Sequence, residues 1–527
     1  MAFPVKSLCN LSVSIAFLFC AVAASAQTTA NIVGVVQDQA GAVIAGAKVM
    51  ARNLATGLDC EVMSDDNGAF ALVALPIGSY RVRCEKQGFK TAVQDNVVLQ
   101  IAQEVRLNLT LAVGQTSEEI TVSTGVTLAN TENAELGEVI DNKRIVDLPL
   151  NGRNFLQLAE LTPGVSRGAS GGFRGGLVGT LTGANITVNG ARDTDNYFTV
   201  DGVSANDRFF NSLNISPSVD AIQEFKVQSN LYSPESGVTG GAQINIAIKS
   251  GTNDFHGSLF EFFRNDRLNA RNFFDLADSN RDGKLDRPVY QQNQFGFTFG
   301  GPLVKDRTHF FGNGEWLRRR IPQSRALTVP TAKMRNGDFS EFGDGNLATT
   351  GDIDLRNPFA MGRPVFAGNI IPQNQWNAAT RDALSLIPRP TRAGISQNLS
   401  VAPAFRTDTD QYIARLDHRF SDKDVVYGRF IYSDITAFSP FGSITQGTRG
   451  GAAVPGNGWD LTLDTLNLAA NYTRVWTTRL ITEARFGWNQ VSGGQVHQTL
   501  ATITPSATSC KGFWPSTMTT AASRAFP

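Results

Sequence analysis

The stretch DSNRDGKLD, residues 278–286, carries oxygen-bearing side chains at a spacing that could bind calcium. The candidate ligands are Asp278, Asn280, Asp282 and Asp286. A helix-loop-helix calcium sensor needs a bidentate glutamate at the twelfth loop position and a helix after it. Here that position is Val289, directly after Pro288, so the sensor site is excluded. The pair Asp282-Gly283 predicts a hairpin turn instead, and a weak calcium ion that stabilises the loop is the alternative.

Other residue patterns that could support chemistry are incomplete. A zinc peptidase needs a His-x-x-Glu ligand pair, and none of the 4 histidines has glutamate three residues later. The phosphate-binding G-x-x-x-x-G-K-[ST] motif does not occur in the chain. The acidic residues between 193 and 207 are explained by Asp- and Asn-rich turns rather than by paired catalytic carboxylates. The sequence therefore predicts a protein that is not an enzyme and has no cofactor.

The overall composition favours β-structure and gives no electrostatic signature of a partner. The 47 basic and 47 acidic residues cancel, so no global field indicates nucleic-acid binding. Glycine, at 50 residues, and phenylalanine, at 34, are both frequent. This combination suits twisted, turn-rich sheets better than helical bundles.

Residues 1–26 have the features of an export signal. Lys6 precedes the apolar run LSVSIAFLFCAVAA, and Ala24-Ser25-Ala26 forms a small-residue cleavage site. Beyond this segment no stretch offers the ~20 apolar residues of a membrane-spanning helix, so any membrane crossing must use β-strands. After cleavage, Cys60 and Cys84 could form a disulfide in an oxidising compartment, or could both be buried free thiols.

Residues 27–112 alternate short apolar-polar strands with glycine and Asp-Asn-Gly turns, which predicts a small antiparallel β-sandwich. The segments GVVQDQAGAVIAGAKV, SDDNGAFALVALPIGSYRV and EKQGF resemble the carboxypeptidase regulatory-like domain, a transthyretin-like sandwich. This resemblance implies no peptidase activity. The fold is often grouped with carbohydrate-binding sandwiches, and sugar binding is only an analogy at the level of the fold.

Residues 127–252 contain a series of motifs in a fixed order. They are the helical segment NGRNFLQLAELTPGV, then Arg192, TVDGV, AIQEFKV and GGAQINIAIKSGT. This order resembles the α+β plug domain of TonB-dependent outer-membrane receptors, and LPLNGRNF after a regulatory-like domain resembles the Oar-like branch. In the helical segment, Asn151 or Asn154 is the expected N-cap and Phe155, Leu158 and Leu161 the expected apolar face.

The resemblance implies functional elements at two places. Residues 113–126 would be a linker that contains the TonB box, a short strand paired by the periplasmic protein TonB. The candidate box is Glu118, Glu119, Ile120, Thr121, Val122, Ser123 and Thr124; a plain linker is the alternative. In the plug motif, Arg192, Asp201 and Gly202 are expected to be structural, with Arg192 and Asp201 forming a buried pair.

Residues 253–527 contain ribbons in which apolar and polar residues alternate. Seven candidate strands are expected near 254–264, 290–301, 306–320, 409–420, 424–434, 461–476 and 479–491. Their length fits the ~9–11 residues of a membrane-crossing strand. The segment 321–407 is expected to be a long extracellular loop. Closed receptors of this kind have about 22 strands, so the sequence is expected to be the N-terminal part of a longer receptor.

The sequence thus predicts a mainly β protein with a sandwich, a plug and the first strands of a transmembrane barrel. By the resemblance it is a TonB-dependent transporter, exported by the Sec pathway to the outer membrane, with its N-terminal domain in the periplasm. The expected partners are the TonB-ExbB-ExbD complex, outer-membrane lipid and an unidentified substrate, with no nucleic acid. The alternative is a secreted or surface-exposed carbohydrate-binding or adhesion protein, whose ribbons form soluble sandwiches.

Overall fold

The structure is a computed structural model that describes most of the chain. The described residues are 29–114, 119–122, 135–168, 185–207, 211–232, 240–271, 273, 284–285, 287–342, 354–377, 381–382, 384–385, 387–440, 458–477 and 480–497. The expected export signal and the four calcium ligand candidates lie outside these residues. No helix among the described residues combines the length and the apolar character that a membrane span requires.

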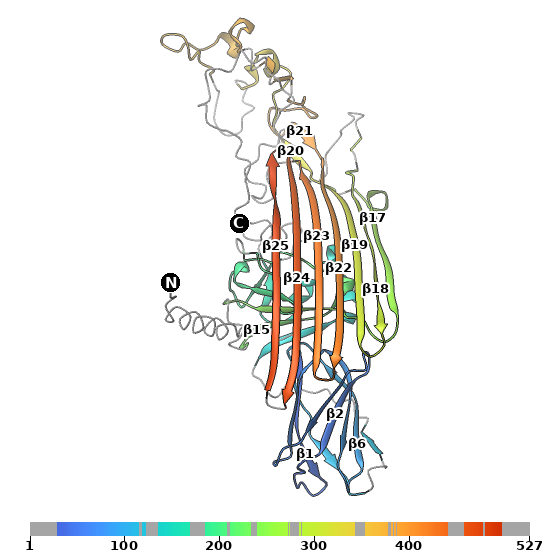
Figure 1. Cartoon of the computed structure of the whole chain (residues 1–527). Helices are drawn as coiled ribbons and strands as arrows, with labels where there is room; N and C mark the ends of the chain where they lie inside the picture. The colour runs from blue at the N-terminus through green and yellow to red at the C-terminus, as the bar shows by residue number, and fades with distance from the viewer. Residues whose placement is uncertain are drawn as a thin grey trace, which may run out of the picture.

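Residues 29–114 form a sandwich of two small sheets, as the alternation predicts (Figure 1). The first sheet contains β1 (Ala30–Asp38), β4 (Ala69–Leu75), β7 (Glu104–Arg106) and β8 (Leu109–Leu111). The second sheet has the order β3 (Asp59–Met63), β2 (Lys48–Asn53), β5 (Gly78–Glu85), β6 (Thr91–Leu99) and β9 (Glu119–Val122). Alternate residues of β1 are buried, and the core between the sheets contains Ile32, Leu75 and Tyr80.

The two cysteines of the sandwich are free, so the disulfide alternative is wrong. Cys60 on β3 lies opposite Ala51, and Cys84 on β5 lies opposite Val49, both on β2. Because β2 separates them, and their opposite residues on β2 are two positions apart, their Cα atoms are roughly 12 Å apart. A disulfide needs about 4.4–6.8 Å. Burial raises the pKa of both thiols to about 12, which keeps them protonated and unreactive.

Residues 135–249 form a middle domain around a five-stranded mixed sheet. Its order is β10 (Leu136–Asp141), β15 (Ile222–Asn230), β16 (Gln243–Ile248), β13 (Tyr197–Val200) and β14 (Val203–Ser204). The pair β11 (Val165–Arg167) and β12 (Ile186–Val188) lies beside it. The short helices are α2 (Asn142–Asp147) and the 3-10 turns η1 (Asn151–Arg153), η2 (Phe155–Leu161), η4 (Asp193–Asp195) and η5 (Val219–Ala221).

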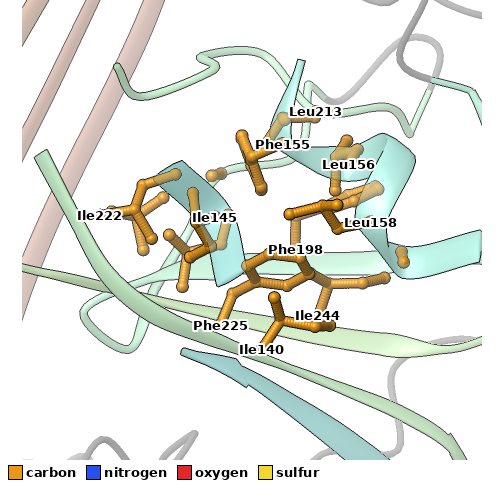
Figure 2. Packing of buried hydrophobic residues seen from close by; sticks show 14 of the residues in the cluster. Ile140, Ile145, Phe155, Leu156, Leu158, Phe198, Leu213, Ile222, Phe225 and Ile244 are labelled. Atoms are coloured by element: carbon orange, nitrogen blue, oxygen red, sulfur yellow. The ribbon is translucent and has the colours of Figure 1, made fainter. Parts of the chain in front are cut away.

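The helical segment of the middle domain packs on one face of its sheet (Figure 2). Asn154 is the N-cap of η2, since its side chain accepts a hydrogen bond from the Leu156 backbone N–H. The buried residues of η2 are Phe155, Leu156, Leu158 and Ala159. Leu161 is 54% exposed, so the expected helical face was wrong at this position. Leu161 is the last residue of η2, directly before the C-cap Thr162.

The third part is an antiparallel meander of seven strands in one continuous sheet. Its strands are β17 (His256–Asn265), β18 (Gln291–Val304), β19 (Thr308–Pro322), β22 (Ala404–Ser421), β23 (Asp424–Ser439), β24 (Trp459–Thr477) and β25 (Leu480–His497). All seven expected strands are present, and several run longer than the sequence pattern predicted. The seven strands form one continuous sheet and not the separate sandwiches that the alternative expects.

The two faces of this sheet differ in chemistry. On β18, the alternating residues Phe295, Phe297 and Phe299 lie on the outer face and remain 39–48% exposed. Gln294 and Thr298 occupy alternate positions of β18 on the inner face and are buried. Figure 1 shows the middle domain against this inner face, with the sandwich below the strand ends. The polar inner face is therefore covered by the middle domain, while the aromatic outer face has no cover among the described residues.

The long connection between β19 and β22 covers residues 323–403, slightly less than the expected loop. It contains a two-stranded sheet of β20 (Arg325–Leu327) and β21 (Leu399–Val401). Its 3-10 turns are η8 (Met334–Asn336), η9 (Ser340–Phe342), η10 (Ala367–Asn369) and η11 (Gln373–Gln375); one more, η7 (Asp266–Leu268), follows β17. The Arg335 guanidinium donates to the carbonyl oxygens of Leu384 and Ile387, both at 2.9 Å. These contacts give the loop a packed local structure.

Candidate functional site at the interface of the middle domain and the sheet

The site is built around the tight turn between β13 and β14. Asp201 and Gly202 both have positive φ, at 48° and 73°. A two-residue hairpin with positive φ at both central positions is a type I′ turn, for which Asp-Gly is a favoured pair. The sequence VDGV therefore folds locally into a sharp turn, and this turn presents the Asp201 carboxylate to the sheet.

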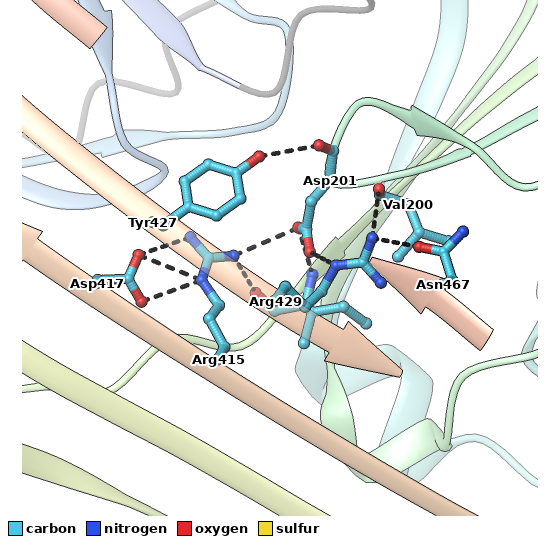
Figure 3. A network of polar contacts seen from close by, with 8 residues as sticks. Val200, Asp201, Arg415, Asp417, Tyr427, Arg429 and Asn467 are labelled. Atoms are coloured by element: carbon cyan, nitrogen blue, oxygen red, sulfur yellow. Dashed lines mark hydrogen bonds and ion pairs between the residues drawn. The ribbon is translucent and has the colours of Figure 1, made fainter. Parts of the chain in front are cut away.

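Asp201 is a buried carboxylate held between two arginines of the sheet (Figure 3). Its Oδ1 lies 3.3 Å from Nη1 of Arg415 on β22, and its Oδ2 lies 2.8 Å from Nε of Arg429 on β23. Only 3% of the Asp201 side chain and none of the Arg429 side chain is exposed. Because these ion pairs are buried, salt screens them much less than it screens ion pairs on the surface.

A second carboxylate balances the charge of this cluster. Asp417 lies 2.9 Å from Nη2 of Arg415, whose guanidinium also stacks 4.5 Å from the centroid of the Tyr427 ring. The Tyr427 hydroxyl donates a 2.9 Å hydrogen bond to the Asp201 backbone carbonyl. Two carboxylates and two guanidinium groups make the cluster electrically neutral. Neutrality and hydrogen bonding together are the conditions under which buried charges are tolerated.

The backbone of the same turn is bound by further strands. Arg429 donates to the Val200 carbonyl at 3.1 Å, and Arg485 of β25 donates to the Gly202 carbonyl at 3.3 Å. Gly487 of β25 allows close approach, because a Cβ there would lie 2.5 Å from a methyl group of Val203. The turn thus contacts β22, β23 and β25, and we name this arrangement the plug-sheet cluster: Asp201, Arg415, Asp417, Tyr427 and Arg429.

A second polar contact fixes the middle domain to the sheet. Ser218 donates its hydroxyl to Glu315 of β19 at 2.7 Å, and its backbone N–H to Gln411 of β22 at 2.6 Å. Arg153 forms an ion pair with Asp220 and lies over the Phe262 ring of β17, 4.0 Å from its centroid. The middle domain is therefore attached by polar contacts along most of the width of the sheet.

The N-terminal sandwich is attached at the ends of the strands. The backbone N–H of Asn253 donates to the Ala55 carbonyl at 2.8 Å, and Arg419 donates to the Gly57 carbonyl at 3.3 Å. Lys226 of β15 donates to the Ala102 carbonyl at 2.9 Å. A cavity of about 420 Å³ lies where the sandwich, the middle domain and the strand ends meet.

Glu224 is a buried carboxylate at the junction of the sandwich and the middle domain. It is 6% exposed and accepts a hydrogen bond from the backbone N–H of Ile101. Burial is the main cause that raises the pKa of Glu224 to about 7. At neutral pH this group therefore binds a proton more readily than an ordinary glutamate does.

We expect this junction to lose stability as the pH rises. From its ordinary pKa of 4.5 up to about 7, Glu224 binds more protons in the folded chain than in the unfolded chain. Stability therefore falls through this window, by about 3 kcal/mol in total, and the loss is complete above it. Urea midpoints at pH 5 and pH 8 measure the difference. Glu224→Gln should remove much of this difference between the two pH values. The control Glu138→Gln, at a half-exposed carboxylate on β10, should keep it. Equal pH dependence of the urea midpoint in both variants would show that Glu224 is not the group responsible.

The expected pairing of Arg192 with Asp201 is wrong. Arg192 is exposed and its backbone N–H donates to Asp195 at the start of η4. The partners of Asp201 come from the sheet instead. The sequence carried one signal for them, because alternation along QYIARLDHRF placed Arg415 and Asp417 on the same polar face.

The structure describes the candidate TonB box only in part and the calcium candidates not at all. Glu119, Ile120, Thr121 and Val122 form β9, whereas Glu118, Ser123 and Thr124 lie outside the described residues. The calcium candidates Asp278, Asn280, Asp282 and Asp286 also lie outside them. Within the part of the chain that the structure describes, no group of three His, Cys, Asp or Glu side chains is arranged to hold a metal ion.

Comparison with known families agrees with the two-faced sheet. The family model described as "Outer membrane beta barrel domain" matches residues 247–527, more than half of the chain. The chain belongs to this family. Its seven-stranded sheet is accordingly part of an outer-membrane β-barrel, and the protein is located in the outer membrane. A second model, "Carboxypeptidase regulatory-like domain", matches residues 31–112, the N-terminal sandwich.

This outer-membrane barrel protein is a homologue of the TonB-dependent transporter Oar of Myxococcus xanthus. The two are 29% identical over 397 residues, which cover 72% of this chain and 35% of Oar. The chain thus spans about a third of the length of this curated relative. Solved structures include the outer membrane transporter YddB of Escherichia coli, with TM-score 0.43, 13% identity, and coverage of 69% of this chain and 40% of YddB. The siderophore receptor PirA of Pseudomonas aeruginosa has TM-score 0.37, 12% identity, and coverage of 68% and 41%.

Proposed function

We propose that this chain acts in a TonB-dependent transporter that moves a large substrate across the outer membrane. In this proposal the middle domain is the plug, residues 118–124 contain the TonB box, and TonB with ExbB and ExbD supplies the energy. The observation that carries the proposal is the plug-sheet cluster. It attaches a separately folded domain to the inner face of a barrel sheet by buried ion pairs. The apolar part of the same contact is formed on the sheet by Phe311, Ile413 and Ile431.

A polar attachment of this kind suits a domain that must be moved. Hydrogen bonds are short-ranged, and water can replace them one at a time as the domain shifts. An apolar interface of the same area would resist opening until most of it was exposed. Force applied near residue 120 would reach the plug at β10, the first strand after the box.

The connections between strands indicate the orientation in the membrane. Short turns at residues 305–307 and 422–423 lie at the end where the sandwich is attached. The long connection 323–403 lies at the opposite end (Figure 1). Bacterial barrels have short periplasmic turns and long extracellular loops. The sandwich and the box would therefore be periplasmic, where TonB is expected.

Crosslinking in cells tests the proposal without a known substrate. Thr121→Cys should form a disulfide with a TonB that carries a single cysteine in its carboxy-terminal domain. The matched control is Lys143→Cys, at an exposed position on α2 of the plug, which should not crosslink. Immunoblotting of outer-membrane fractions under non-reducing conditions reads the result. A chain that reaches the outer membrane and crosslinks at neither position, or equally at both, would contradict the assignment.

A further inference from the structure

The candidate box is already part of a sheet. β9 pairs in parallel with β6, in the register Thr91 with Glu119 through Gln94 with Val122. This pairing makes β9 the last strand of the five-stranded sheet of the sandwich. The segment is therefore held in the extended conformation by the regulatory-like domain.

The sequence of β9 and the shape of β6 explain this pairing. Ile120, Thr121 and Val122 are β-branched residues, which favour strands. β6 is continuous through residues 91–94. Its register with β5 shifts directly after them, between Gln94 and Val97, where Asn96 has a positive φ of 57°. A bulge ends regular pairing. The edge of β6 therefore offers a short acceptor, about the length of β9.

The other edge of β9 has no neighbour among the described strands. A strand has two edges, and an outermost strand exposes a row of backbone N–H and C=O groups on one of them. Such an edge is the natural acceptor for a strand of another protein. The pairing with β6 leaves this acceptor available rather than covering it.

We propose that the regulatory-like sandwich presents the box to TonB as a preformed edge strand, so that TonB adds as the next strand after β9. This inference rests on the proposed function and specifies how the same segment is recognised. An isolated box must be ordered when TonB pairs with it, and that ordering costs conformational entropy. Pairing with β6 orders the segment in advance, so the intact chain should bind TonB more tightly than a free peptide with the box sequence.

A disulfide that locks β9 onto β6 tests the inference. Thr91→Cys with Glu119→Cys, in a Cys510→Ser background, joins residues that are directly opposite in adjacent strands. Their Cα atoms are about 4.8 Å apart, within the range for a disulfide. Asp95→Cys with Glu119→Cys is the control. It uses the same strand four residues out of register, about 13 Å away, and should not close.

The binding partner in the assay is the purified carboxy-terminal domain of TonB, measured on the full chain before and after reduction. We expect the in-register pair to close, the control pair to stay open, and the locked chain to bind TonB as tightly as the reduced chain. Two results would overturn the proposal that the sandwich presents the box, while the proposed function stands. One is failure of the in-register pair to form its disulfide. The other is a loss of affinity for TonB of about tenfold or more when that disulfide is closed. If neither the reduced chain nor the box peptide binds TonB, the proposed function is wrong. The proposal that the sandwich presents the box is then wrong as well.

Discussion

Asp201→Asn is expected to loosen the plug from the sheet by about 3–5 kcal/mol, the usual cost of removing one partner of a buried ion pair. Asparagine keeps the shape of the side chain and tolerates the positive φ of this turn, so the substitution removes mainly the charge. Arg429, whose side chain is fully buried, then has no carboxylate among its described contacts. Protease digestion of the plug in folded chains, at increasing urea, measures the change.

Two further variants show whether charge is the cause. Glu160→Gln removes a carboxylate from an exposed position on η2 of the same domain and should leave the urea midpoint unchanged. Asp201→Asn combined with Arg429→Met should lose less than the sum of the single variants, because no unpaired charge stays buried. Equal effects of Asp201→Asn and Glu160→Gln, or strict additivity in the double variant, would show that the plug-sheet cluster does not hold the plug.

Phe225→Ala is expected to unfold the plug itself, at a cost of about 3–5 kcal/mol. Phe225 on β15 is fully buried and packs edge-to-face on Phe155 of η2, with 5.3 Å between the ring centroids. It joins the helical layer to the sheet (Figure 2). The truncated side chain would leave a cavity that the rigid β15 cannot close. Amide hydrogen exchange in β15 and β16 should rise, which Asp201→Asn should not cause.

The control for this variant is on the same helical segment as Phe155. Leu161→Ala removes a large apolar side chain that is 54% exposed, so it should change stability by no more than about 0.5 kcal/mol. Similar losses for Phe225→Ala and Leu161→Ala would mean that the packing between η2 and the sheet does not determine the stability of the plug. An unchanged exchange rate in β15 of Phe225→Ala would lead to the same conclusion.

Much of the architecture could be read from local sequence patterns. A strand with one polar and one apolar face shows this in every second residue, so all seven strands of the sheet were predicted. Their ends were less accurate: β22 begins at Ala404 rather than near 409, because backbone pairing continues where the alternation fades. The short helix before Thr162 was also predicted, but its 3-10 geometry and the exposure of Leu161 at its last position were not.

The sequence alone determined the fold class, the order of domains and the turn that presents Asp201, since each depends on residues close together in the chain. Tertiary structure decided the partners. Asp201 and Arg415 are 214 residues apart, and alternation gives the face on which an arginine lies but not the group it meets. The same limit applies to Cys60 and Cys84, which β2 separates, and to the candidate box, whose pairing with β6 depends on which strand edge is left open. Contacts between distant segments follow from how the domains pack, and no local pattern contains that information.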